Sequence, residues 1–145
     1  MPRIERHAKV TWEGNVARGE GLISAGTVAF TDLPYSLPAR ISSGNEGKTS
    51  PEELIAAAHA ACFSMALSHG LAQQGNAPEQ LKTAATVTFV PGTGITKIAL
   101  TVRARVPGLD EAAFAEAART AKENCPVSQA LAGVNEITLD ASLES

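Results

Sequence analysis

Residues 50–67 read SPEELIAAAHAACFSMAL, and this stretch decides the fold. Ser50 suits the N-cap of a helix, Pro51 suits its first position, and Glu53 suits the carboxylate of a capping box. The residues that follow are apolar almost without interruption. A helix that is apolar nearly all round is covered on more than one side. We therefore expect a long central helix wrapped by a sheet or by a second subunit.

Segments with strand patterns flank this helix on both sides. Before it we expect short strands at residues 7–12, 18–25, 27–30 and 39–41, followed by a loop at 42–48. After it we expect strands at 81–90 and 95–106, helices at 111–123 and 127–131, and a last strand at 136–143. This order predicts an α+β fold with largely antiparallel strands. No repeat or linker interrupts the chain, which predicts a single domain over residues 1–145.

The composition is that of an ordinary globular protein, with 44% apolar and 19% charged residues in a chain of 145. The net charge is −3, and acidic and basic residues are interspersed. The absence of a basic block argues against a nucleic-acid partner. The polar amino terminus lacks the apolar core of a signal peptide, and we expect no apolar run long enough to cross a bilayer. We expect a cytoplasmic protein without a membrane partner.

The chain has two cysteines, Cys62 and Cys125. In a reducing compartment they are either inert buried thiols or a pair that cycles between oxidation states. Cys62 lies in the middle of the apolar helix, where burial raises the pKa of a thiol, so its reactivity needs a neighbouring cation. Cys125 precedes Pro126 and suits the N-cap of a short helix, where free N–H groups favour a thiolate. Local context therefore favours Cys125 as the thiol of lower pKa, unless it serves only as a cap.

Four further side chains are candidates for a site around these thiols. His59 lies three residues before Cys62 on the same helix face, as a base for the thiol or as a packed or interface histidine. Glu52 is not required by the helix cap, and its carboxylate suits a bidentate ion pair that orients an arginine. Arg18 and Arg40, in the strand region before the helix, are the candidates for that arginine.

The central stretch resembles the central-helix signature of the OsmC/Ohr family, the osmotically inducible and organic hydroperoxide resistance proteins. Residues 124–131, NCPVSQAL, resemble the second-cysteine motif of the same family. Residues 12–14 together with 18–19, and residues 95–100, resemble its OsmC branch. The resemblance covers nearly the whole chain. It implies an intertwined homodimer in which antiparallel sheets wrap around two central helices that pack together.

The resemblance also implies roles for the site residues. Cys62 matches the peroxidatic cysteine and Cys125 the resolving one, which reverses the preference from local context. Glu52 matches the family's glutamate. The arginine of the Ohr branch falls near Arg18, whereas that of the OsmC branch matches Arg40, which we prefer. The implied activity is reduction of organic hydroperoxides, and more slowly of hydrogen peroxide, through a sulfenate and a disulfide that an external dithiol reduces. No haem, flavin or metal is required.

Other functions remain compatible with the same residues. The thiols suit a non-enzymatic redox sensor or a protein induced by oxidative or hyperosmotic stress that only binds a partner. They also suit a structural module with inert cysteines. A cysteine hydrolase using Cys62 and His59 is a further alternative, but the sequence offers it no clear oxyanion hole and no third orienting residue.

Overall fold

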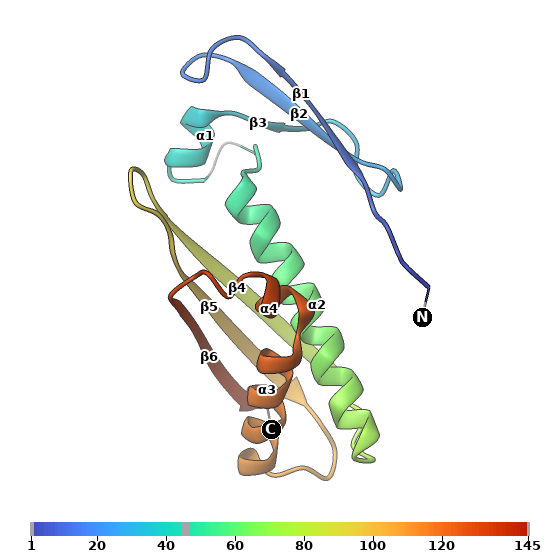
Figure 1. Cartoon of the computed structure of the whole chain (residues 1–145). Helices are drawn as coiled ribbons and strands as arrows, with labels where there is room; N and C mark the ends of the chain where they lie inside the picture. Colours follow the sequence, from blue (N-terminus) through green and yellow to red (C-terminus); the bar gives the residue numbers. More distant parts are fainter. Residues whose placement is uncertain (1, 45–46, 145) are drawn as a thin grey trace. The chain divides into compact units, whose positions relative to one another are not determined.

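The computed structural model describes residues 2–44 and 47–144 (Figure 1). The chain forms two compact units, Met1–Pro51 and Glu52–Ser145. Each unit has its own sheet of three strands. Together the sheets and helices make the fold α+β, as the sequence predicts. The extent of the domain, residues 1–145, stays a prediction.

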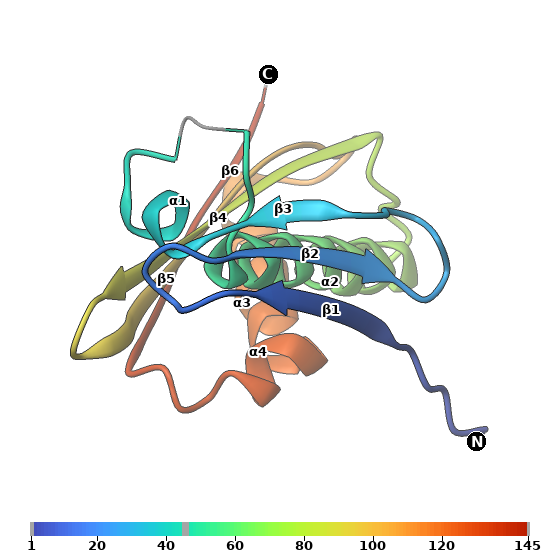
Figure 2. The ribbon, with the colours of Figure 1, turned by 90° about the horizontal axis from the view of Figure 1, so that it is seen from above.

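The first unit is built on an antiparallel sheet with its three strands in sequential order (Figure 2). The strands are β1 (Ala8–Glu13), β2 (Glu20–Ala25) and β3 (Leu33–Tyr35), and the short helix α1 (Leu37–Ile41) follows them. Pro34 lies within β3, where it cannot donate a hydrogen bond to a neighbouring strand. It is tolerated because β3 is an edge strand of this sheet.

Two of the strands that the sequence predicts in this unit, at residues 27–30 and 39–41, do not form in the structure. Residues 27–30 form a turn, in which Val28 has a positive φ of 64° and the backbone N–H of Ala25 donates to Phe30 at 3.0 Å. Residues 39–41 belong to helix α1, because Ser36 caps that helix and accepts a hydrogen bond from the Ala39 N–H at 3.2 Å. The expected loop at 42–48 lacks regular structure where it is described, and residues 45–46 lie outside the described residues.

The second unit contains the elements that follow the boundary between the units. They are α2 (Pro51–Gln73), β4 (Gln80–Val90), β5 (Gly94–Arg105), α3 (Glu111–Asn124), α4 (Pro126–Ala130) and β6 (Glu136–Leu143). Helix α2 begins directly after Ser50, as predicted. Strands β4 and β5 form the predicted antiparallel hairpin, whereas β6 pairs with β5 in parallel. The expectation of largely antiparallel strands is confirmed, since among the described strands only the β5–β6 pair is parallel. This pair is parallel because α3 and α4 carry the chain back before β6 starts.

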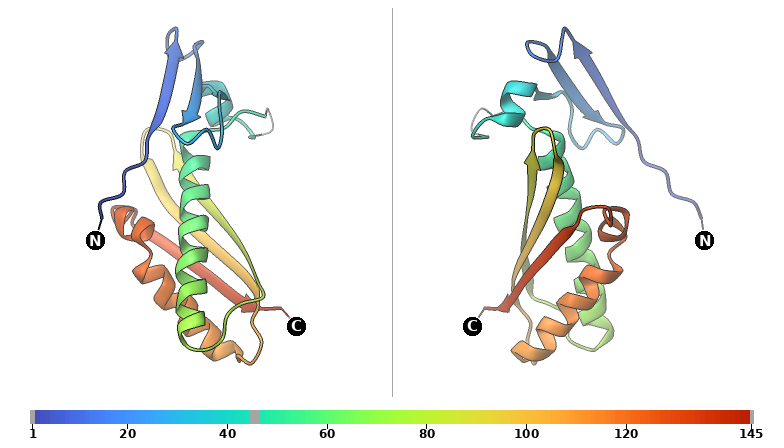
Figure 3. Two further views of the ribbon diagram at one scale, coloured as in Figure 1. Left: turned by 90° about the vertical axis from the view of Figure 1, so that its right-hand side faces the viewer. Right: turned by 60° about the vertical axis from the view of Figure 1, so that its left-hand side comes forward.

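Helices α2 and α3 cover the same face of the β4–β5–β6 sheet (Figure 3). Alternate residues of β5 point to this face and are almost fully buried. The core they form with the helices consists of Phe63, Leu67, Leu71, Leu100, Val102, Ala104, Val106, Phe114, Ala118, Ala121 and Cys125. One of the two cysteines is thus a member of the hydrophobic core, and Cys62 packs against it.

Within the described residues of the second unit, helix α2 is buried along one side only. Its buried residues follow a single stripe, while Ala57, Ala58 and Ala61 are exposed and Met65 is 75% exposed. By length and composition alone α2 is able to cross a membrane, so the expectation that no apolar run is long enough is wrong. The core helix of a soluble protein has the same character, and α2 supplies Phe63 and two leucines to the core.

Candidate thiol site

The structure brings Cys62 and Cys125 together, although they lie far apart in the sequence. Cys62 is in the middle of α2 and half-buried, whereas Cys125 lies between α3 and α4 and is fully buried. Both are free thiols, and their side chains lie close enough for each to shift the pKa of the other. Two free thiols in direct contact define a dithiol site, in which a disulfide can form once one sulfur is oxidised.

Cys125 is positioned by two helices at once. Its backbone N–H donates to the carbonyl of Ala121 at 2.9 Å and so ends α3. Its carbonyl accepts from the N–H of Gln129 at 3.0 Å and so begins α4, with Pro126 in the first turn. The predicted N-cap position of Cys125 is confirmed. The sulfur therefore lies where the first backbone N–H groups of α4 have no carbonyl partner within the helix.

The surroundings of the two thiols shift their pKa values in opposite directions. Burial raises the pKa of Cys62, the backbone N–H of Val127 opposes this, and Cys125 adds to it. Burial acts to raise the pKa of Cys125 as well, but the backbone and hydroxyl of Ser128 and the Cys62 thiol outweigh it, so the pKa of Cys125 is lowered. The second unit therefore favours a thiolate at Cys125, as local sequence context predicts. A reactive Cys62 needs a cation in addition.

His59 lies on the same side of α2 but is hydrogen-bonded to α4 rather than to Cys62. Its Nε2 lies 2.7 Å from Oγ of Ser128, and among the described residues its Nδ1 has no hydrogen-bond partner. Burial lowers the pKa of His59, and the positive charge of Lys122 lowers it further. The imidazole is fully buried, and both effects favour its neutral form. Among the described residues, no three His, Cys, Asp or Glu side chains gather where they are able to hold a metal ion.

Glu52 is not adjacent to Cys62 within one chain. It is buried in the first turn of α2, ten residues before the cysteine. At about 1.5 Å per residue this places the two residues about 15 Å apart along the helix axis. A direct action of Glu52 on Cys62 of the same helix is excluded by this separation.

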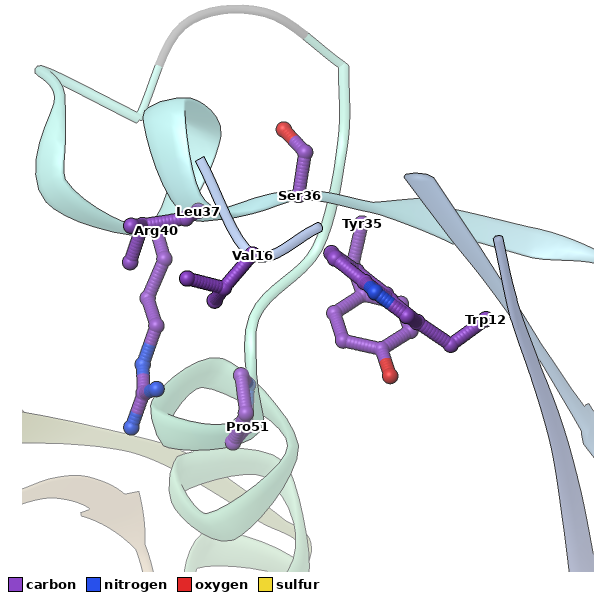
Figure 4. A pocket seen from close by; sticks show the side chains of 7 residues that line it. All are labelled: Trp12, Val16, Tyr35, Ser36, Leu37, Arg40 and Pro51. Carbon is purple, nitrogen blue, oxygen red and sulfur yellow. The ribbon is translucent and has the colours of Figure 1, made fainter. Parts of the chain in front are cut away.

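Arg40 lines a small pocket in the first unit. The pocket has a volume of about 200 Å³ and is lined by Trp12, Val16, Tyr35, Ser36, Leu37, Arg40 and Pro51. Figure 4 shows the Arg40 side chain along one side of the pocket and the Trp12 and Tyr35 rings on the opposite side. The centroids of these rings are 5.5 Å apart. Arg18 lies instead in the turn between β1 and β2, where its backbone N–H donates to Asn15.

The aromatic pair and Ser128 were not identified as site residues from the sequence. Trp12 and Tyr35 are the only tryptophan and tyrosine of the chain, which in a protein so poor in aromatic residues is a usable signal. Ser128 lies three residues after Cys125, the N-cap of α4. The backbone N–H of the residue at this position faces the side chain of the N-cap residue. That spacing predicts that the backbone N–H of Ser128 faces the Cys125 sulfur.

The α+β fold and the two neighbouring thiols define the class as a protein with a two-cysteine thiol site. Comparison with known proteins defines this class further. A family model described as OsmC-like protein matches residues 44–140. The chain is 44% identical to the peroxiredoxin OsmC of Escherichia coli (strain K12), over 98% of this chain and 99% of that one. It is 32% identical to the organic hydroperoxide resistance protein of Xanthomonas axonopodis pv. citri, over 74% and 77% of the two chains.

A solved structure agrees with these sequence matches. The crystal structure of an organic hydroperoxide resistance protein OsmC from Legionella pneumophila superposes with a TM-score of 0.73 and 26% identity, over 98% of this chain and 99% of the other. The protein therefore belongs to the OsmC family, and the resemblance found in the sequence is confirmed.

Proposed function

We propose that this protein is a thiol-dependent peroxidase that reduces organic hydroperoxides and, more slowly, hydrogen peroxide. The observation that carries the proposal is the contact between Cys62 and Cys125. The names of the relatives support it, because one is a peroxiredoxin and another an organic hydroperoxide resistance protein. Membership of the same family supports a common reaction.

The reaction proceeds in three balanced steps. The Cys62 thiolate attacks the terminal oxygen of the hydroperoxide, the O–O bond breaks, and the alcohol leaves with a proton while Cys62 becomes a sulfenic acid. The Cys125 sulfur then attacks the sulfenic sulfur, so that the S–O bond breaks, water leaves and a disulfide forms. An external dithiol reduces this disulfide by exchange and is itself oxidised to a disulfide.

Arg40 and Glu52 activate Cys62 in this proposal. A guanidinium keeps its charge when it is desolvated, and a carboxylate holds it by a bidentate ion pair. Since Glu52 lies about 15 Å from Cys62 along α2, the glutamate that acts on each thiol comes from a second copy of the chain. Arg40 is preferred over Arg18 because it lines an apolar pocket beside two aromatic rings, which suits the organic tail of a hydroperoxide.

The protein acts as a cytoplasmic homodimer in this proposal. The exposed apolar face of α2, which includes Ala58, Ala61 and Met65, supports pairing of two central helices. The two free thiols support a reducing compartment. Sedimentation equilibrium tests the assembly, with a mass of twice the 15.0 kDa of one chain as the expected result. A monomer at micromolar concentration would contradict it.

The activity is tested by stopped-flow consumption of cumene hydroperoxide and of hydrogen peroxide with dithiothreitol as the reductant. We expect fast turnover of the organic peroxide and much slower turnover of hydrogen peroxide. The variants Cys62→Ser and Cys125→Ser are a matched pair. The first loses peroxide consumption, whereas the second retains one oxidation to a sulfenic acid that dimedone traps. Normal turnover by Cys62→Ser, or no turnover by wild-type protein whose thiols titrate as reduced, would contradict the proposal.

A further inference from the structure

A buried polar pair connects the central helix to the helix that carries Cys125. The imidazole Nε2 of His59 on α2 lies 2.7 Å from the hydroxyl oxygen of Ser128 on α4. His59 is fully buried and Ser128 is 8% exposed. Ser128 is the third residue after Cys125, the N-cap of α4, and its hydroxyl acts on the Cys125 sulfur to lower the pKa of that thiol. One hydroxyl thus joins an imidazole that the reaction does not use to the sulfur of the second cysteine.

The direction of these hydrogen bonds follows from the protonation of the imidazole. A neutral histidine carries its proton on one ring nitrogen, and Nδ1 of His59 has no partner within the described part of the chain. A buried N–H without an acceptor is rarer in proteins than a buried acceptor without a donor. The proton therefore belongs on Nε2, which donates to Ser128, and the Ser128 hydroxyl is left to donate to the sulfur of Cys125.

We infer that His59 and Ser128 form a relay of two hydrogen bonds that positions Cys125 and favours its thiolate for the disulfide-forming step. Ser128 contacts the reacting sulfur, and His59 is a positioning residue that acts through Ser128. The inference rests on the proposed function, since it assigns these residues to the second step of that reaction. It predicts little effect on the first step, the oxidation of Cys62.

His59 and Ser128 exchange no atoms with the reactants while the disulfide forms. The Cys125 thiolate attacks the sulfenic sulfur of Cys62, the S–O bond breaks, and the oxygen leaves as water with the proton that Cys125 released. His59 and Ser128 keep their own protons and only donate hydrogen bonds. A hydrogen bond to a charged group is stronger than one to a neutral group, so the relay stabilises the thiolate more than the thiol.

The experiment compares Ser128→Ala with two substitutions of His59 that differ in which nitrogen they imitate. The amide nitrogen of Gln reaches the position of the imidazole Nε2, whereas that of Asn reaches the position of Nδ1. A single equivalent of cumene hydroperoxide is mixed with reduced protein without a reductant. Rapid acid quench and mass spectrometry then measure the rates of sulfenate and disulfide formation. In the Cys62→Ser background, thiolate absorbance measures the pKa of Cys125.

We expect Ser128→Ala and His59→Asn to slow disulfide formation about tenfold and to raise the pKa of Cys125. Oxidation of Cys62 stays within about twofold of the wild-type rate, since the relay contacts only Cys125. His59→Gln restores both readouts, which a merely structural role of the imidazole does not predict. Wild-type disulfide rates in Ser128→Ala and His59→Asn, or equal loss in both His59 variants, would overturn the inference. If the wild type forms no sulfenate, the proposed function fails, and an unchanged Cys125 pKa in Ser128→Ala would separately refute the relay.

Discussion

Acidification from about pH 8 to about pH 5.5 will destabilise the second unit through His59. Burial and the charge of Lys122 lower the pKa of this histidine below its ordinary value of 6.5. In the unfolded chain the histidine titrates near that ordinary value. Between the two pKa values the unfolded state binds one proton more than the folded state, so stability falls as the pH falls. The stabilisation by neutral His59 is complete above 6.5 and is lost progressively below it.

Proton linkage limits the size of this effect. One group contributes at most about 1.4 kcal/mol per pH unit, so His59 alone accounts for up to about 1.4 kcal/mol at pH 5.5. Urea denaturation followed by circular dichroism, at one fixed protein concentration and several pH values, measures it. His59→Gln carries no titrating group at this position and is the matched control. Lys122→Gln removes the neighbouring positive charge, and we expect it to flatten the pH dependence. Parallel loss of stability in wild type and His59→Gln would refute the reasoning.

Three further substitutions test the core of the second unit, the aromatic pair of the first unit and the proposed dimer. Phe63→Ala removes a fully buried ring from the core of the second unit and should lower the free energy of unfolding by about 3–5 kcal/mol, measured by urea denaturation. Gly21→Ala places a Cβ in steric conflict with Cε1 and Cζ of Tyr35 and 2.8 Å from the Trp12 ring, so we expect changed tryptophan fluorescence and lower stability; an unchanged spectrum would contradict this. Met65→Asp puts a charge on the exposed apolar face of α2 and should shift sedimentation toward the monomer without changing the circular dichroism spectrum.

The elements that the sequence predicts well carry their own local signals. Helix α2 begins at the proline that follows Ser50, and α3 begins after Asp110, whose carboxylate accepts from the Ala113 N–H at 2.8 Å. The β4–β5 hairpin shows alternation on both sides of a glycine-containing turn. In each case the residues that decide the structure are neighbours in the sequence. Local propensity and tertiary packing then favour the same conformation.

The features that were predicted wrongly, or that no local pattern specifies, depend on tertiary contacts or on a helix cap that the sequence analysis overlooked. Residues 39–41 look extended, yet Ser36 and the proline two residues later start a helix there. The direction of β6 depends on the path of α3 and α4, which no pattern within 136–143 reveals. The pairing of the two thiols came from family resemblance, because nothing local to either cysteine indicates that they meet. The roles of Arg40 and Glu52 stay predictions for the same reason.

The opposed pKa shifts of the two cysteines fit a reaction that needs the negative charge at different sulfurs in turn. The first step needs a thiolate at Cys62, although burial and Cys125 raise its pKa. In the proposed reaction the charge of Arg40 overcomes that bias, so Arg40→Met should slow sulfenate formation and leave the later disulfide step unchanged. Once Cys62 is a sulfenic acid it no longer competes for the charge, and Cys125, whose pKa is already lowered, is ready to attack. A slower disulfide step in Arg40→Met, measured after the sulfenate has formed, would show that one cation serves both sulfurs and would contradict this division.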